Sequence, residues 1–288
     1  MTNVIVARSV DEALATLSEA PDITILAGGT DLMVEINRGL RQLNSVIALA
    51  QVPELHRWSI GEDRLMIGAG VTYTTMLNTK LAQAAPALAQ AARTVGSPPI
   101  RNAGTLGGNL GTASPAGDTL PVLAALNASI VLDGPSGERC LSLEEFMVGV
   151  KRTCLAPGEL IKAVEMDHLS GGQEYLKIGP RNAMVISMAG VALAVDRKAK
   201  QVRCALGAVA ANIPRASEAE AWVGERINWD SGTGVDSVLA QEFGQRMAAE
   251  SSPIDDHRST AAYRRHAVGV LAARALQRVF SEGTNGYV

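Results

Sequence analysis

Two glycine-rich stretches place the strongest constraint on how this chain can fold. The first, LAGGTDLM at 26–33, follows a short apolar run and precedes a helical pattern that Gly39 ends. The second, TLGGNLGTASPAGDTLP at 105–121, has four glycines among small polar residues and leads into another apolar run. Glycine permits tight turns, and the unpaired N–H groups at a helix start attract anions, typically phosphate. Each stretch alone is compatible with an ordinary turn. Together they predict one ligand with a long pyrophosphate, contacted by backbone amides from both sides.

Neither stretch matches a common nucleotide motif. Both G-x-x-x-x-G-K-[ST] and G-x-G-x-x-G are absent, which argues against an ATP P-loop and a Rossmann nicotinamide site. Cys140, Cys154 and Cys204 have no paired spacing, and no two of the four histidines have metal-ligand spacing. The sequence therefore predicts no metal site on this chain. Without a metal partner, Asp118 is expected to accept hydrogen bonds from hydroxyls or to cap the helix that follows it.

Composition and charge narrow the class of protein further. The chain has 288 residues, 47% of them hydrophobic, which is enough for about two domains with a sizeable core. A net charge of −3 argues against binding to nucleic acid or to an anionic membrane. The longest strongly apolar run, at 188–195, is too short to span a bilayer, and the first residues lack the order of a secretion signal. A cytoplasmic location is expected.

The pattern of apolar residues predicts an α+β fold in two regions, divided near residue 170. Before the division, strand, turn and helix patterns alternate, and Ser97-Pro98-Pro99 predicts an extended segment. S-x-x-E sequences that begin at Ser9 and Ser142 predict capping boxes. After a linker at 169–174, the runs MAGVALAV and KQVRCALGAVA predict antiparallel strands, and two helical patterns close the chain.

The two glycine stretches carry a resemblance to a known family. AGGTDL at 27–32 and TLGGNLGTASPAGDTLPVL at 105–123 closely resemble the FAD-binding medium subunit of molybdenum hydroxylases, such as carbon monoxide dehydrogenase and xanthine dehydrogenase. The resemblance covers almost the whole chain, since PGELI, YLKIGPR, ALGAVAANIPRASEAEAW and DDHRSTAAYRR also match the family pattern. It implies an FAD-binding domain of the vanillyl-alcohol-oxidase (PCMH) type over 1–170, with subdomains of about 1–55 and 56–170. A smaller domain like the C-terminal domain of the CO dehydrogenase flavoprotein would follow over 171–288.

The resemblance also implies which residues bind FAD. The first stretch would wrap the pyrophosphate and ribityl region with Leu26, Ala27, Gly28, Gly29, Thr30, Asp31, Leu32 and Met33. The second would form another phosphate loop with Thr105, Gly107, Gly108, Asn109 and Thr112. Asp118 would bind the adenosine ribose, and Lys177 would lie close to the isoalloxazine. Ile161 would pack near the adenine or the ring system, and Val95 occupies a position where an aromatic side chain would stack on FAD. Neither loop contains a histidine, so the resemblance implies non-covalent FAD.

The same resemblance implies an electron-transfer subunit that has no catalytic residue of its own. Electrons from a molybdenum cofactor on a large subunit would pass through [2Fe–2S] clusters on a small subunit to FAD, and then to an external acceptor. Such complexes are commonly dimers of heterotrimers. The cluster at 255–258 is expected to cap a helix. Two alternatives stay open: a self-sufficient FAD-dependent oxidoreductase of the same fold, and an assembly or maturation protein that has lost the cofactor.

Overall fold

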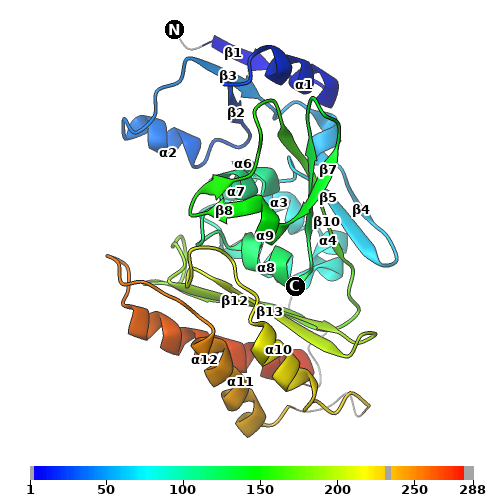
Figure 1. Cartoon of the computed structure of the whole chain (residues 1–288), viewed down its shortest axis with the longest axis vertical. Coiled ribbons are helices and arrows are strands. Elements are labelled where there is room, and N and C mark those ends of the chain that lie inside the picture. The colour runs from blue at the N-terminus through cyan, green and yellow to red at the C-terminus, as the bar shows by residue number, and fades with distance from the viewer. Residues whose placement is uncertain (1–2, 231–234, 282–288) are drawn as a thin grey trace.

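The computed structural model describes residues 3–230 and 235–281 and shows the chain as two stacked parts (Figure 1). The last seven residues of the predicted C-terminal domain, 282–288, lie outside the described ones. The N-terminal part contains a three-stranded parallel sheet and a five-stranded antiparallel sheet, and the C-terminal part contains a three-stranded antiparallel sheet. No helix of the described residues is long and apolar enough to cross a membrane.

The parallel sheet has the order β1-β3-β2 and lies at the N-terminal end of the molecule. Its elements are β1 (Asn3–Val6), α1 (Val10–Glu19), β2 (Thr24–Leu26), α2 (Leu32–Asn37) and β3 (Ser45–Ala48). The Ser9 hydroxyl caps α1 by accepting from the N–H of Glu12, but the Glu12 carboxylate accepts from the N–H of Arg8. In a capping box the Glu12 carboxylate would accept from the N–H of Ser9, so the second bond of the expected box is displaced by one residue. Gly39, with φ of 70°, follows the end of α2 as predicted.

The five-stranded sheet has the order β4-β5-β10-β6-β7, so the strand that comes last in the chain is its central strand. The strands are β4 (Trp58–Ile60), β5 (Arg64–Gly68), β6 (Ser129–Asp133), β7 (Arg139–Ser142) and β10 (Leu160–Asp167). The turn at 134–137 joins β6 to β7 as a hairpin, as predicted. Leu160 belongs to the core under α1, whereas Ile161 belongs to the main core of the N-terminal part. The start of β10 therefore joins two cores.

Short helices pack beside this sheet and connect its strands. They are η1 (Pro53–His56), α3 (Tyr73–Met76), α4 (Thr79–Ala84), α5 (Pro86–Thr94), α6 (Pro98–Ala103), α7 (Leu106–Thr112), α8 (Thr119–Ala125) and α9 (Leu143–Phe146). The small hairpin of β8 (Met147–Gly149) and β9 (Arg152–Thr153) follows α9. Ser142 and Glu145 form the predicted capping box at the start of α9.

The predicted extended segment at 97–99 is wrong in its extent. Only Ser97 is extended, with φ of −90° and ψ of 168°, and α6 begins directly at Pro98. Proline suits the first position of a helix because its fixed φ is already helical and its missing N–H has no partner there anyway. The restriction that a proline imposes applies to the residue before it.

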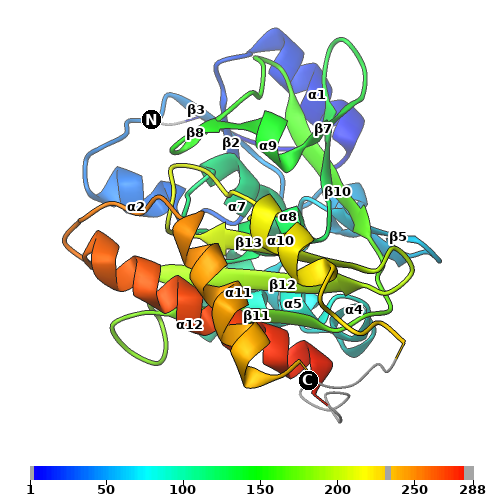
Figure 2. The same cartoon turned by 60° about the horizontal axis from the view of Figure 1, so that its bottom comes forward.

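The C-terminal part is a sheet that carries its own helices on one face and packs its other face against helices of the N-terminal part. Its elements are β11 (Gln173–Ile178), β12 (Ala189–Asp196), β13 (Gln201–Gly207), α10 (Ser217–Gly224), α11 (Ser237–Ala249) and α12 (Ala261–Phe280). Helices α11 and α12 cover one face (Figure 2), and Val191, Leu193 and Leu206 pack in the core beneath them. The smaller Ala192 and Ala194 face the main core of the N-terminal part. The predicted antiparallel strands and closing helices are confirmed, and burial of both faces explains the unbroken apolar run of β12.

The charged residues at 255–258 serve the start of α12, as expected. The Asp255 carboxylate accepts from the N–H of Ala261. The Asp256 carboxylate accepts from the Arg264 guanidinium at 2.6 Å. Arg264 is 4% exposed and also donates to the carbonyls of Met188 and Ala208. This cluster therefore holds the start of α12 to the sheet.

We expect the cluster to lose its contribution to stability in acid. Desolvation raises the pKa of Asp256, but the N–H of Arg258 and the Arg264 guanidinium outweigh it and lower this pKa from 3.8 to about 2. Because the folded pKa lies below the unfolded one, the contribution is complete above about pH 4 and is lost as pH falls towards 2. Thermal unfolding between pH 5 and 2 should therefore show a steeper loss for the native chain than for Asp256→Asn. Parallel curves would contradict the assignment.

Candidate functional site

The two glycine stretches meet at one cavity of about 890 Å³, between the parallel sheet and the five-stranded sheet. From the predicted site it is lined by Leu26, Ala27, Gly28, Gly29, Thr30, Asp31, Leu32, Thr105, Gly107, Gly108, Asn109, Thr112 and Ile161. The stretches also contact one another directly. The Thr112 hydroxyl lies 3.3 Å from Oδ2 of Asp31, and a Cβ added to Gly28 would lie 1.8 Å from the carbonyl oxygen of Ala103.

The first stretch supplies backbone donors to the cavity. The N–H groups of Gly28, Gly29, Thr30 and Asp31 have no hydrogen-bond partner within residues 3–230 and 235–281. Gly29 has φ of 70°, a conformation that glycine adopts without strain. Gly28, Gly29 and Thr30 are half-buried and Asp31 is exposed, so these N–H groups are accessible to a ligand in the cavity. This row of amides is therefore suited to an anionic group in the cavity.

The second stretch does not supply donors in the same way. The N–H of Leu106 donates to the carbonyl of Val71, and the N–H of Gly107 donates to that of Ala69 at 2.8 Å. The N–H of Gly108 donates to the Thr105 hydroxyl, which caps α7. The prediction that both stretches offer amides to a ligand is thus wrong for these three. Here glycine allows close packing instead, since a Cβ on Gly107 would lie 2.6 Å from that of Ala69.

Four residues of the predicted site do not line the cavity: Met33, Val95, Asp118 and Lys177. Asp118 and Lys177 form an ion pair at 2.7 Å, with side chains 8% and 9% exposed. Asp118 also accepts from the hydroxyls of Tyr175 at 2.8 Å and Ser187 at 2.6 Å. The resemblance implied the adenosine ribose for Asp118 and the isoalloxazine for Lys177. Because Asp118 and Lys177 form one ion pair, this position can lie beside either the ribose or the isoalloxazine, but not beside both.

Several cavity-lining residues were missed from the sequence. Arg41 and Lys151 lie on either side of Glu35, at 3.8 and 3.6 Å from its carboxylate oxygens. Tyr73 and an apolar wall of Leu17, Ile23, Leu49, Leu55, Leu155 and Leu160 also line the cavity. The segment 157–161 matches the family pattern, and this match could have predicted that the residues near it line the cavity. Nothing in the local sequence marks Tyr73, Arg41 or Lys151.

These features define a class: a protein whose cavity, between two sheets, suits a phosphate-bearing ligand. Family models match the chain over residues 1–167, as an FAD binding domain in molybdopterin dehydrogenase, and over residues 174–279, as a CO dehydrogenase flavoprotein C-terminal domain. The chain belongs to the family of FAD-binding medium subunits of molybdenum hydroxylases. Its fold is the two-domain FAD-binding α+β fold of that family.

Relatives and solved structures cover nearly the whole chain. The glyceraldehyde dehydrogenase medium chain of Sulfolobus acidocaldarius is 31% identical and aligns with 95% of this chain and 96% of its own length. The nicotine 6-hydroxylase medium subunit of Paenarthrobacter nicotinovorans is also 31% identical, over 93% of each chain. A solved structure, reconstituted CO dehydrogenase from Oligotropha carboxidovorans, gives a TM-score of 0.88 at 25% identity over 97% of both chains. The chain is thus the flavoprotein subunit of a molybdenum-containing oxidoreductase with further subunits.

Proposed function

We propose that this chain binds FAD non-covalently in the 890 Å³ cavity, with the pyrophosphate on the free amides of residues 28–31. The observation that carries the proposal is this row of unpaired donors on a wall of the cavity. When bound, the flavin supplies electron transfer, from iron–sulfur clusters on a partner subunit to an external acceptor. The chain itself binds, orients and shields it.

The residues present fit such a ligand. Ligand cavities range from about 300 to 1,000 Å³, so this cavity is large enough for a dinucleotide. The glycine amides suit the negative phosphates, and Arg41 and Lys151, both close to the Glu35 carboxylate, are the basic side chains that line the cavity. The apolar wall, which includes Leu55 and Ile161, suits an aromatic ring. We include the cavity-lining residues of both stretches in the FAD site.

We further propose that Asp118 and Lys177 shape the site from outside the cavity. Lys177 lies on β11, and its Nζ donates to the carbonyls of Thr94 and Val185 at 3.2 Å each. Asp118 lies directly before α8, near the end of the second stretch. The pair therefore joins the C-terminal sheet to the region that contains the site. We assign Val95, next to Thr94, to the same supporting role. Met33, on α2 and 47% exposed, would instead support the first stretch, since its side chain lies beside Gly29.

The domain boundary near 170 and the subdomain boundary near 55 are part of this proposal. In its support, β10 ends at Asp167 and β11 starts a separate sheet at Gln173. Likewise, η1 separates the parallel sheet from the five-stranded one. The cytoplasmic location stays a prediction.

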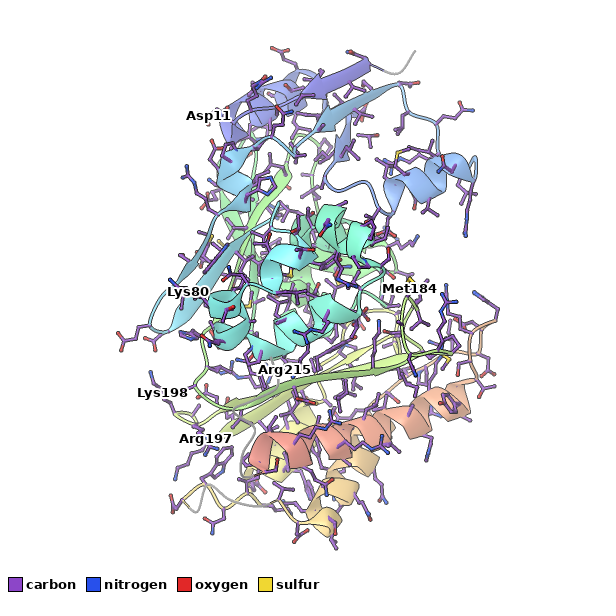
Figure 3. All side chains as sticks on the ribbon, turned by 180° about the vertical axis from the view of Figure 1, so that it is seen from behind. Asp11, Lys80, Met184, Arg197, Lys198 and Arg215 are labelled. Carbon is purple, nitrogen blue, oxygen red and sulfur yellow. The ribbon has the colours of Figure 1, made fainter. Side chains whose placement is uncertain are left out.

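We propose that a large partner subunit carries the molybdenum cofactor, that a small one carries the iron–sulfur clusters, and that two such heterotrimers form a dimer. Large apolar side chains stay exposed on two loops that could contact other subunits. Val148 and Val150 on the β8–β9 hairpin are 52% and 55% exposed. Met184 (Figure 3) and Ile186, in the loop after β11, are 55% and 53% exposed. Exposed apolar patches often mark protein contacts. Native mass spectrometry of the purified complex gives the stoichiometry.

The test of this proposal is the absorbance spectrum of the tagged protein purified from its own host, followed by acid release of the flavin. We expect flavin bands, released FAD, and iron–sulfur absorbance from two co-purifying subunits. A colourless protein would exclude the FAD site. FAD without partner subunits, together with turnover of a simple substrate, would instead favour the self-sufficient oxidoreductase.

A further inference from the structure

Tyr73 is held firmly at the wall of the cavity. It is the first residue of α3 and is 5% exposed. Its N–H donates to the carbonyl of Gly104 at 3.0 Å. Its ring lies so close to Gly104 that a Cβ there would be 2.7 Å from Cε2. Backbone and ring contacts thus fix the direction of the hydroxyl.

The hydroxyl of Tyr73 has no hydrogen-bond partner in the described part of the chain. Its position differs from that of Tyr175, which is equally buried and donates to Asp118 at 2.8 Å. The Tyr73 oxygen also does not belong to the fully enclosed unpaired polar atoms. Since Tyr73 lines the cavity, we conclude that its small remaining exposure opens there.

The surroundings keep this phenol protonated. Burial raises the pKa of Tyr73, and the negative charges of Asp118 and Asp31 raise it further. Neither carboxylate bonds to it: Asp118 accepts from Lys177 and from three other hydroxyls, and Asp31 accepts from Thr112. The Tyr73 hydroxyl is therefore an uncharged donor at the cavity, and the described part of the chain provides no acceptor for it.

We propose that the Tyr73 hydroxyl is a hydrogen-bonding contact for FAD and positions it in the cavity. The inference rests on the proposed function. Burying a hydroxyl without a partner costs free energy, and a polar atom of the ligand removes that cost. Tyr73 is thus a binding residue that lies outside both glycine stretches, in the segment that pairs with the second of them through Thr72 and Thr105.

The test is Tyr73→Phe in the full chain, stripped of flavin and titrated with FAD by fluorescence. We expect the Kd for FAD to rise about 5- to 10-fold, as for loss of one neutral hydrogen bond. The thermal midpoint of the flavin-free variant should equal or exceed that of the native chain, because no bond within the protein is lost. A structural role would lower that midpoint instead.

Tyr263→Phe is the matched control, since Tyr263 is 44% exposed on α12. It should change neither measurement. An unchanged Kd in Tyr73→Phe, or a Kd that rises only together with a lower flavin-free midpoint, would overturn the inference. Failure of the native chain to bind FAD would instead overturn the proposed function.

Discussion

Gly28→Ala is expected to weaken FAD binding strongly and to destabilise the chain. The added Cβ would lie 1.8 Å from the carbonyl oxygen and 2.5 Å from the carbonyl carbon of Ala103, and both are backbone atoms. No side-chain rotation can relieve this clash, so the first stretch must move away from α6. We expect a loss of about 3 kcal/mol in the free energy of unfolding. Displacement of the free amides should weaken FAD binding on the order of 100-fold.

The control for this prediction is Gly224→Ala. Gly224 ends α10, and the nearest atom to an added Cβ is 3.8 Å away, which is an ordinary contact. Urea unfolding and FAD titration of both variants separate the clash from a general effect of alanine. If Gly28→Ala bound FAD like the native chain, the first stretch could not be the phosphate loop.

Lys177→Met is expected to have the second large effect, on stability. It leaves the Asp118 carboxylate buried with the hydroxyls of Tyr175 and Ser187 but without a counter-charge. Removing one partner of a buried ion pair costs about 3–5 kcal/mol. Because Lys177 is on β11 and Asp118 precedes α8, urea unfolding should show the two parts of the chain separating at lower denaturant.

An exposed pair provides the comparison. Lys198 also reaches across the two parts, to Asp63 at 2.9 Å, but its side chain is 78% exposed at the side of the molecule (Figure 3). Lys198→Met should change stability by less than about 1 kcal/mol, as exposed pairs do. Adding Asp118→Asn to Lys177→Met should recover part of the loss, because the unpaired charge is removed. Equal effects of the two lysine variants would mean that the Asp118 pair is solvated.

Sequence patterns revealed those parts of the fold that local rules decide. The capping box at Ser142, the hairpin turn at 134–137 and the apolar run of β12 depend on neighbouring residues and were predictable. The pairing of β10 with β5 was not, since Val164 and its partner Ile67 are far apart in the chain. Such pairing depends on how the whole chain folds.

The site divides in the same way. Glycine marked both stretches, because close approach and a positive φ require it at Gly28 and Gly29. Asp118 was expected to accept from hydroxyls or to cap a helix; it accepts from the hydroxyls of Tyr175 and Ser187, but it makes no cap bond. In the sequence, an acidic residue before a helix looks the same whether its side chain caps that helix or bonds to a distant strand. No motif around Tyr73 marks it as a site residue, since its role depends on a cavity formed by residues that are distant in the sequence.

The central place of β10 has a consequence for the order of events on the ribosome. Until residue 167 has emerged, β5 and β6 lack the strand that lies between them, and their facing edges stay open. At roughly 5–20 residues per second, both glycine stretches leave the ribosome seconds before their cavity can close. Ile161, on β10, is part of the wall of that cavity. Capture of the proposed cofactor would therefore follow synthesis of the whole N-terminal part, and a product truncated before β10 would carry both glycine stretches yet hold no FAD.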